Sequence, residues 1–210
     1  MDLDTAYMIT ALVTMFVVID PIGIAPLFLA LTPGMSAAQR RRIALRAVCV
    51  AGFVLALFAF FGEALLGFVG ISMPAFRIAG GILLFLTALD MLFERRTKRR
   101  EDRTEEEDTE DPSVFPLAIP LIAGPGAIAS VILLIGEKPG GEGLVVMLGI
   151  TAFVLMAMAL ILMASSYVDR LIGKTGIDVI SRVLGMLLAA LSVQFVLDGL
   201  AAFGFGPGAG

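Results

Sequence analysis

Two short motifs in this sequence combine a proline with residues that suit the binding of ions or carboxylates. The first is Asp20-Pro21-Ile22-Gly23 and the second is Gly124-Pro125-Gly126-Ala127. Proline lacks a backbone N–H and disfavours helix at the residue before it, so each motif is expected to interrupt a helix. Asp20 is also a good N-cap, and proline suits the first helical position. Each motif therefore predicts a broken helix that restarts at its proline.

A restarted helix offers free N–H groups and a partial positive charge, which together suit a carboxylate. Because Gly124 and Gly126 have no side chains, we expect a ligand to approach the backbone there. At the other break, Asp20 suits a coupling cation or a substrate amine, with a pure capping role as the alternative. A carboxylate at the bilayer centre costs about 2.5 kcal/mol or more, which favours function. The predicted substrate-binding residues are Asp20, Pro21, Gly23, Gly124, Pro125, Gly126 and Ala127, and Asp20 is also a candidate Na⁺ site.

The elements that must position these motifs are long apolar segments. Hydrophobic residues make up 59% of the 210 residues and charged residues 16%, whereas soluble domains have roughly 45–50% and about 25%. Backbone groups cannot stay unpaired in lipid, so the segments must be helices. We expect one all-α polytopic membrane domain, 1–210, in which the first and fourth of six transmembrane helices are broken. The predicted spans are 5–31, 44–69, 73–93, 114–135, 144–168 and 179–203.

An internal repeat relates the two motifs. Pro21 and its neighbours align with Pro125 at an offset of 104, and Arg77 aligns with Arg182 at an offset of 105. The predicted repeats are 1–93 and 114–210, joined by a charged, solvated cytoplasmic linker, 94–113. Since each repeat has three spans, the second must be inverted relative to the first. Inverted repeats are typical of secondary transporters, which bind substrate near the membrane midplane at the repeat interface.

The connections between spans predict the orientation. Nearly all Lys and Arg residues outside the spans fall in the first, third and fifth connections, and the first includes Arg40 and Arg46. The positive-inside rule therefore places both termini outside the cell.

Several classes of chemistry are excluded by composition. The chain has no His and one Cys, Cys49, so His-dependent catalysis, haem ligation by His and thiolate metal cages are excluded. We interpret Cys49 as a small packing residue. No basic, aromatic-rich surface indicates nucleic acid, and polar catalytic pairs are too few to favour an enzyme. No cofactor is expected.

Other charges lie nearer the ends of the spans. Glu63 and Arg77 flank the short connection between the second and third spans and could pair. With Arg182, we assign them structural or gating roles. The small residues Gly80, Gly81 and Gly185 are expected to allow close helix packing.

Longer stretches carry a resemblance to a known family. They are VVIDPIGIAPLFLALT, GISMPAFRIAGGILLFLTALDMLF, VFPLAIPLIAGPGAIASVILL and the late VLDGL. The chain closely resembles the MarC family of bacterial and archaeal integral membrane proteins over essentially its whole length. That family looks related to the LysE-type exporters and is described as a neutral amino acid transporter family. The resemblance implies a multi-pass protein of the bacterial or archaeal cell (inner) membrane.

Together these observations predict a secondary transporter, an exporter or exchanger, of small neutral amino acids such as glycine or alanine. The resemblance supplies the amino acid, while the residues supply the broken helices and the buried carboxylate. Coupling to Na⁺ or H⁺ is expected. The alternatives are a cation channel or metal-ion permease that uses Asp20, and an intramembrane enzyme. The expected partners are the lipid bilayer and the amino acid, not nucleic acid, and homo-oligomer formation is left open.

Overall fold

A computed structural model describes residues 5–93 and 111–205 of the chain, apart from the side chains of residues 168, 169 and 174. The described residues form helices and no strand. The elements in chain order are α1 (Thr5–Ile19), α2 (Pro21–Leu31), α3 (Ala37–Val69), α4 (Met73–Leu92), the irregular π-helix η1 (Ser113–Ile122), α6 (Pro125–Glu137), α7 (Gly141–Met163) and α8 (Ser165–Ala202).

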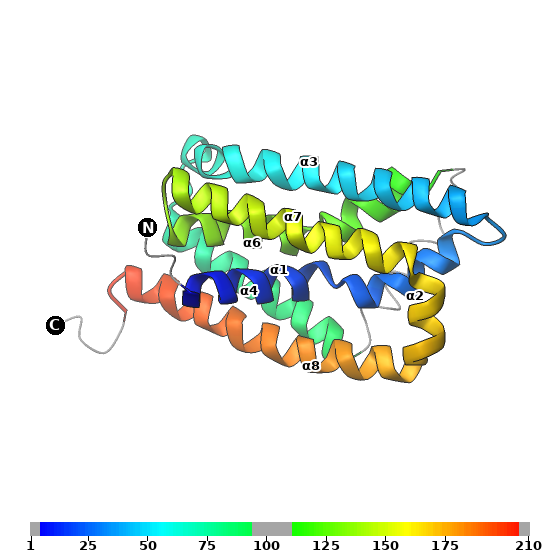
Figure 1. Cartoon of the computed structure of the whole chain (residues 1–210). Helices are drawn as coiled ribbons and strands as arrows, with labels where there is room; N and C mark the ends of the chain where they lie inside the picture. Colours follow the sequence, from blue (N-terminus) through cyan, green and yellow to red (C-terminus); the bar gives the residue numbers. More distant parts are fainter. Residues whose placement is uncertain (1–4, 94–110, 206–210) are drawn as a thin grey trace.

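The helices form an elongated bundle in which α1 begins and α8 ends at the same end (Figure 1). We call this the terminal end. Within the described residues, five helical segments are long and apolar enough to cross a membrane, or six if the bent pair η1 and α6 is one span. Of the five, the segment of α1 and α2 is the most buried. It therefore runs through the interior, whereas α3 presents Phe53, Phe60 and Phe68 outward, as expected of a lipid-facing helix.

Two spans begin earlier than the sequence predicts. The second begins at Ala37 rather than at residue 44, because Ser36 and Gln39 form a capping box that starts the helix before its arginines. The sixth span is Thr175–Ala202 of α8, which begins four residues before the predicted residue 179, although α8 itself begins at Ser165. A kink at Gly173, whose φ is +66°, divides α8 before the apolar segment, and glycine adopts that conformation without a Cβ clash.

The close packing expected at small residues is confirmed between α4 and α8. A Cβ built on Gly81 would lie 2.8 Å from the Ser192 carbonyl oxygen, and one on Gly185 would lie 2.9 Å from the Cβ of Met91. Both glycines therefore let the two backbones approach closely. Cys49, in contrast, is exposed on α3. Its predicted packing role is wrong, because this position of α3 faces away from the bundle.

The division of the chain into two repeats stays a prediction. Most of the predicted charged linker, residues 94–110 of 94–113, lies outside the described residues. The last described helix before the linker, α4, ends at Leu92, and the first described element after it, η1, begins at Ser113.

Candidate functional site

The first predicted break lies between α1 and α2, at Asp20. This residue adopts the left-handed conformation, with φ 56° and ψ 62°, and its side-chain Oδ1 accepts a hydrogen bond of 3.1 Å from the backbone N–H of Gly23. Asp is one of the few residues that visits this region without a large steric cost. Pro21 occupies the first position of α2. The predicted restart with an Asp20 cap is confirmed, and the carboxylate is buried, with 2% of the residue exposed.

Gly23 is required by the same carboxylate. A Cβ on Gly23 would lie 2.2 Å from Oδ2 of Asp20, a distance that no side chain tolerates. The Asp20 side chain therefore folds over the first turn of α2, against the space that Gly23 leaves open. Gly23 serves this site through its missing side chain and through its N–H group.

The second predicted break is also present. Before it, η1 contains two residues with extended backbone, Phe115 and Ile119. Pro125 then starts α6, Gly124 occupies the N-cap position, and η1 and α6 meet at a bend of 51°. A Cβ on Gly124 would lie 2.5 Å from the carbonyl oxygen of Pro120. The chain itself fills the space beside Gly124, so the missing side chain there serves the fold of the break.

The two breaks meet inside the bundle. A Cβ on Gly126, in the first turn of α6, would lie 3.2 Å from Cγ1 of Val18 and 3.6 Å from Oγ1 of Thr87. Val18 is two residues before Asp20, so the end of α1 rests against the start of α6. Ala127 is buried at the same place. The end of α1 therefore packs against the start of α6, while Gly126 stays partly buried and Pro125 is exposed.

A second contact defines how α1 and α6 run. The hydroxyl of Tyr7 donates a hydrogen bond of 3.0 Å to the carbonyl oxygen of Leu134. Tyr7 is at the start of α1 and Leu134 is near the end of α6, whereas Val18 and Gly126 meet at the opposite ends. The two helices are thus antiparallel neighbours from the terminal end to the breaks.

The sequence analysis missed Thr14, a buried polar residue on this seam. Tyr7, Thr14 and Val18 are separated by seven and four residues, which places them on one face of α1. Thr14 is fully buried, and its Oγ1 has no hydrogen-bond partner in the structure as described. Ser130, by comparison, is equally buried but bonds to the Gly126 carbonyl oxygen of its own helix. Its signal in the sequence is a hydroxyl residue inside an apolar span, seven residues after Tyr7 and four before Val18.

The charges at the terminal end are arranged differently from the prediction. Glu63 and Arg77, both described, do not form the expected ion pair. Glu63 instead lines a cavity of about 170 Å³ between α3, α4, α6 and α7. Arg77 acts electrostatically on Glu137, as does Asp198. Arg182 lies toward the other end of the bundle, three residues before Gly185, which packs against Met91; it is exposed on α8 and has an interaction partner.

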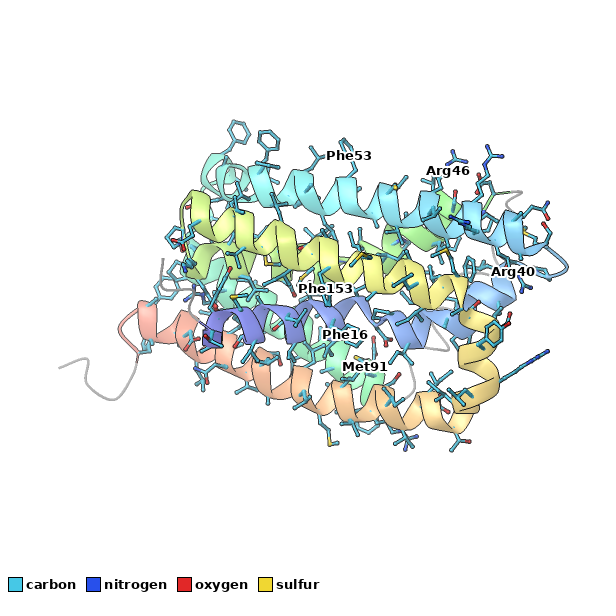
Figure 2. The ribbon with its side chains drawn as sticks, in the orientation of Figure 1. Phe16, Arg40, Arg46, Phe53, Met91 and Phe153 are labelled. Atoms are coloured by element: carbon cyan, nitrogen blue, oxygen red, sulfur yellow. The ribbon has the colours of Figure 1, made fainter. Side chains whose placement is uncertain are left out.

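The opposite end of the bundle is held by arginines, as Figure 2 shows for Arg40 and Arg46. The guanidinium of Arg40 donates to the carbonyl oxygen of Thr32, at 3.0 Å from Nη2. Arg46 forms an ion pair with Asp111, which also accepts a hydrogen bond from the N–H of Ser113. Hydrogen bonding from Ser113, and then the charge of Arg46, hold the pKa of Asp111 below its usual value. We call this the arginine end.

Comparison with known proteins decides the family. The sequence profile of the MarC family integral membrane proteins matches residues 5–203. The chain belongs to the MarC family. The match includes both broken spans, so the site described above is built from segments within the family region.

Curated relatives of this MarC protein come from archaea and bacteria. The UPF0056 membrane protein MJ0972 of Methanocaldococcus jannaschii is 40% identical over 92% of this chain and 86% of its own length. YvbG of Bacillus subtilis, also a UPF0056 membrane protein, is 36% identical over 93% and 94%. The UPF0056 inner membrane protein YhgN of Escherichia coli K12 is 33% identical over 91% and 95%. No solved structure matches the chain. This MarC chain is therefore an integral membrane protein of a family found in archaea and bacteria.

Proposed function

We propose that the chain is a secondary transporter, an exporter or exchanger, of small neutral amino acids such as glycine or alanine, driven by Na⁺ or H⁺. It acts as a carrier and not as an enzyme. The observation that carries this proposal is the meeting of two broken spans, with Val18 beside Asp20 resting on Gly126 of α6. Broken helices that meet in this way are where secondary transporters bind substrate and coupling ion.

The two breaks offer complementary chemistry to a zwitterion. The first N–H groups of α6, at Gly126 and Ala127, have no partner within the helix, because the first four N–H groups of any helix lack one. They suit a carboxylate, and the helix dipole adds to the attraction. Asp20 supplies the negative charge at the neighbouring break, for the amine or for the coupling ion. A small neutral amino acid carries both charges within a few ångströms.

Binding in this proposal requires movement. Val18, Leu84 and Thr87 lie beside Gly126, and Ala127 is buried while Pro125 is exposed, so the start of α6 is partly covered in this conformation. The breaks at Asp20 and at Gly124 lack continuous helical hydrogen bonding and can absorb a change of angle between helix halves. Separation of α1 from α6 would uncover the N–H groups. The partly covered state is then one state of an alternating-access cycle.

The packing of α4 against α8 supports the inverted repeat that such a cycle uses. Gly81 of α4 contacts Val196 of α8, and Gly185 of α8 contacts Met91 of α4. Adding 105 to residue 81 gives the neighbour of Gly185, and subtracting 105 from Val196 gives Met91. The two contacts exchange under the offset to within one residue, as expected if α4 and α8 are equivalent spans of two repeats.

The test is flux through the purified protein in vesicles. Radiolabelled alanine and glycine should enter with saturable kinetics, and an inward Na⁺ or H⁺ gradient should change their accumulation. Unlabelled alanine inside the vesicles should accelerate uptake, because an exchanger returns loaded. A Na⁺ or divalent-cation current that needs no amino acid, with no saturable alanine flux, would favour the cation permease and overturn the proposal.

A further inference from the structure

Three charged residues gather at the terminal end, away from the breaks. Arg77 lies on α4, Glu137 is the last residue of α6 and Asp198 lies near the end of α8. We call them the terminal-end cluster. All three helix segments reach this end of the bundle in Figure 1. Packing fixes the level of α4 against α6, because a Cβ on Gly136 would lie 3.0 Å from Sδ of Met73, one turn before Arg77.

Arg77 and Glu137 lie at the same end of the bundle but do not form an ion pair with each other. Glu137 is influenced by the charges of Arg77 and Asp198, yet neither Arg77 nor Glu137 makes an ion pair or hydrogen bond with any residue in the described ranges. The Nε atom of Arg77 is buried and has no partner there. A buried, unsatisfied donor on a charged group is costly, so a native arrangement of this kind requires an explanation.

The arrangement has the charges of a zwitterion site. A guanidinium presents a planar fork of donors that matches a carboxylate, and Glu137 can accept hydrogen bonds from an ammonium group. Asp198 adds a second negative charge and is oriented by a 2.7 Å hydrogen bond from Gln194 Nε2. Glu137 is exposed, while Arg77 and Asp198 are partly exposed. The cluster is therefore accessible from the terminal end, which is the predicted outer face.

We propose that Arg77, Glu137 and Asp198 form an outer binding site for a small zwitterion, with the carboxylate on Arg77 and the ammonium on Glu137 and Asp198. This inference rests on the proposed function. It adds an outer site that binds substrate before the breaks do, at the terminal end of the contact between α1 and α6. Tyr7 links the two, because its hydroxyl donates a hydrogen bond to Leu134 of α6, three residues before Glu137. Substrate bound at the cluster would lie next to the contact that holds α1 against α6.

The test compares purified wild type, Arg77→Gln and Glu137→Gln in vesicles, with Glu142→Gln as the matched control. Glu142 is a nearby acid whose partner is Lys138, at 3.8 Å, and it lies outside the cluster. Each cluster variant should raise the KM for alanine about tenfold, the effect of one charged hydrogen bond, and leave kcat and the thermal midpoint nearly unchanged. The control should match wild type. Arg77→Lys should bind alanine more tightly than Arg77→Gln but more weakly than wild type, because an ammonium group lacks the planar pair of donors of a guanidinium.

Half-molecules of the substrate distinguish binding from a structural role. Propionate should inhibit alanine uptake in wild type and in Glu137→Gln but lose its effect in Arg77→Gln. Ethylamine should show the reverse pattern. Three results would overturn the site. They are an equal loss of inhibition by propionate and by ethylamine in both variants, an unchanged KM for alanine in the variants, and a raised kcat at constant KM. The last result would indicate a charge lock between helices.

Equilibrium binding separates this site from the proposed function. If calorimetry shows that wild type binds alanine and that Arg77→Gln binds it more weakly, the site is supported. If the vesicles then show no flux, only the transporter proposal fails. Flux without dependence on Arg77 overturns the site alone. Phosphatidylethanolamine also carries an anion and a primary ammonium, so vesicles of pure phosphatidylcholine form a second arm. Dependence on Arg77 that persists there identifies the free amino acid, and dependence that needs phosphatidylethanolamine identifies the lipid headgroup.

Discussion

Val18 and Gly126 are the point of contact between the two broken spans, with 3.2 Å between Cγ1 of Val18 and the position of a Cβ on Gly126. The contact joins the end of α1 to the start of α6. Asp20 follows two residues after Val18, so movement at this contact changes the surroundings of both the buried carboxylate and the N–H groups of α6.

Bulk at Gly126 should weaken substrate binding. Gly126→Val places a branched side chain against Val18 and should lower the thermal midpoint, since overpacking costs about 1–3 kcal/mol, as well as raise the KM for alanine. The control is the double variant Gly126→Ala, Val18→Ala, because Val18→Ala removes the Cγ1 atom that a Cβ at position 126 would meet. The double variant should regain the thermal midpoint but keep a raised KM. Recovery of both quantities would mean that Gly126 serves packing alone and that no carboxylate binds there.

The cap at the first break should depend on Gly23 as much as on Asp20. Gly23→Ala introduces a Cβ that would lie 2.2 Å from the carboxylate, so the side chain of Asp20 must leave its hydrogen bond. We expect a loss of about 1–2 kcal/mol, similar to Asp20→Ala, which removes the cap itself. Thermal unfolding in detergent measures both. If Gly23→Ala unfolds like wild type, the Asp20 cap contributes little to stability.

The breaks could be predicted from sequence because their causes are local. Proline at positions 21 and 125 removes a donor wherever it stands, and Asp20 caps within three residues. The early start of α3 also had a local signal, the Ser36 and Gln39 capping box, which the hydropathy pattern obscured. The placement of Arg77 and Glu137 at the same end of the bundle had none, because it depends on how α4 packs against α6. The outward direction of Cys49 likewise depends on which face of α3 meets the bundle.

The orientation predicted from loop charges can be measured by cysteine labelling. Because Cys49 is exposed, it must first be changed to Ala. Single cysteines at Gly141 and Gly206 should then react with an impermeant maleimide added to intact cells, whereas one at Thr104 should react only after lysis. Labelling of position 104 in intact cells would show that the predicted orientation is reversed and that the terminal end faces the cytoplasm.

The Asp111 contacts predict a small pH dependence of stability. Its pKa is lowered in the folded protein, first by hydrogen bonding from Ser113 and then by Arg46, so the contribution is complete above the ordinary Asp pKa of about 3.9. It is lost as pH falls through the lowered value. Because the pair is half exposed, we expect less than about 1 kcal/mol. Unfolding of wild type and Asp111→Asn should differ slightly at pH 7 and converge in acid; a constant difference would contradict this.

The most direct test of the account is the ion dependence of alanine flux in Asp20→Asn. Asn caps a helix about as well as Asp and tolerates the left-handed conformation, so the variant should fold with a nearly unchanged thermal midpoint. Removal of the buried negative charge should abolish the response of flux to a Na⁺ or H⁺ gradient while leaving weak alanine exchange. If Asp20→Asn carries alanine with the ion dependence of wild type, Asp20 is a helix cap only and coupling does not occur at the broken spans.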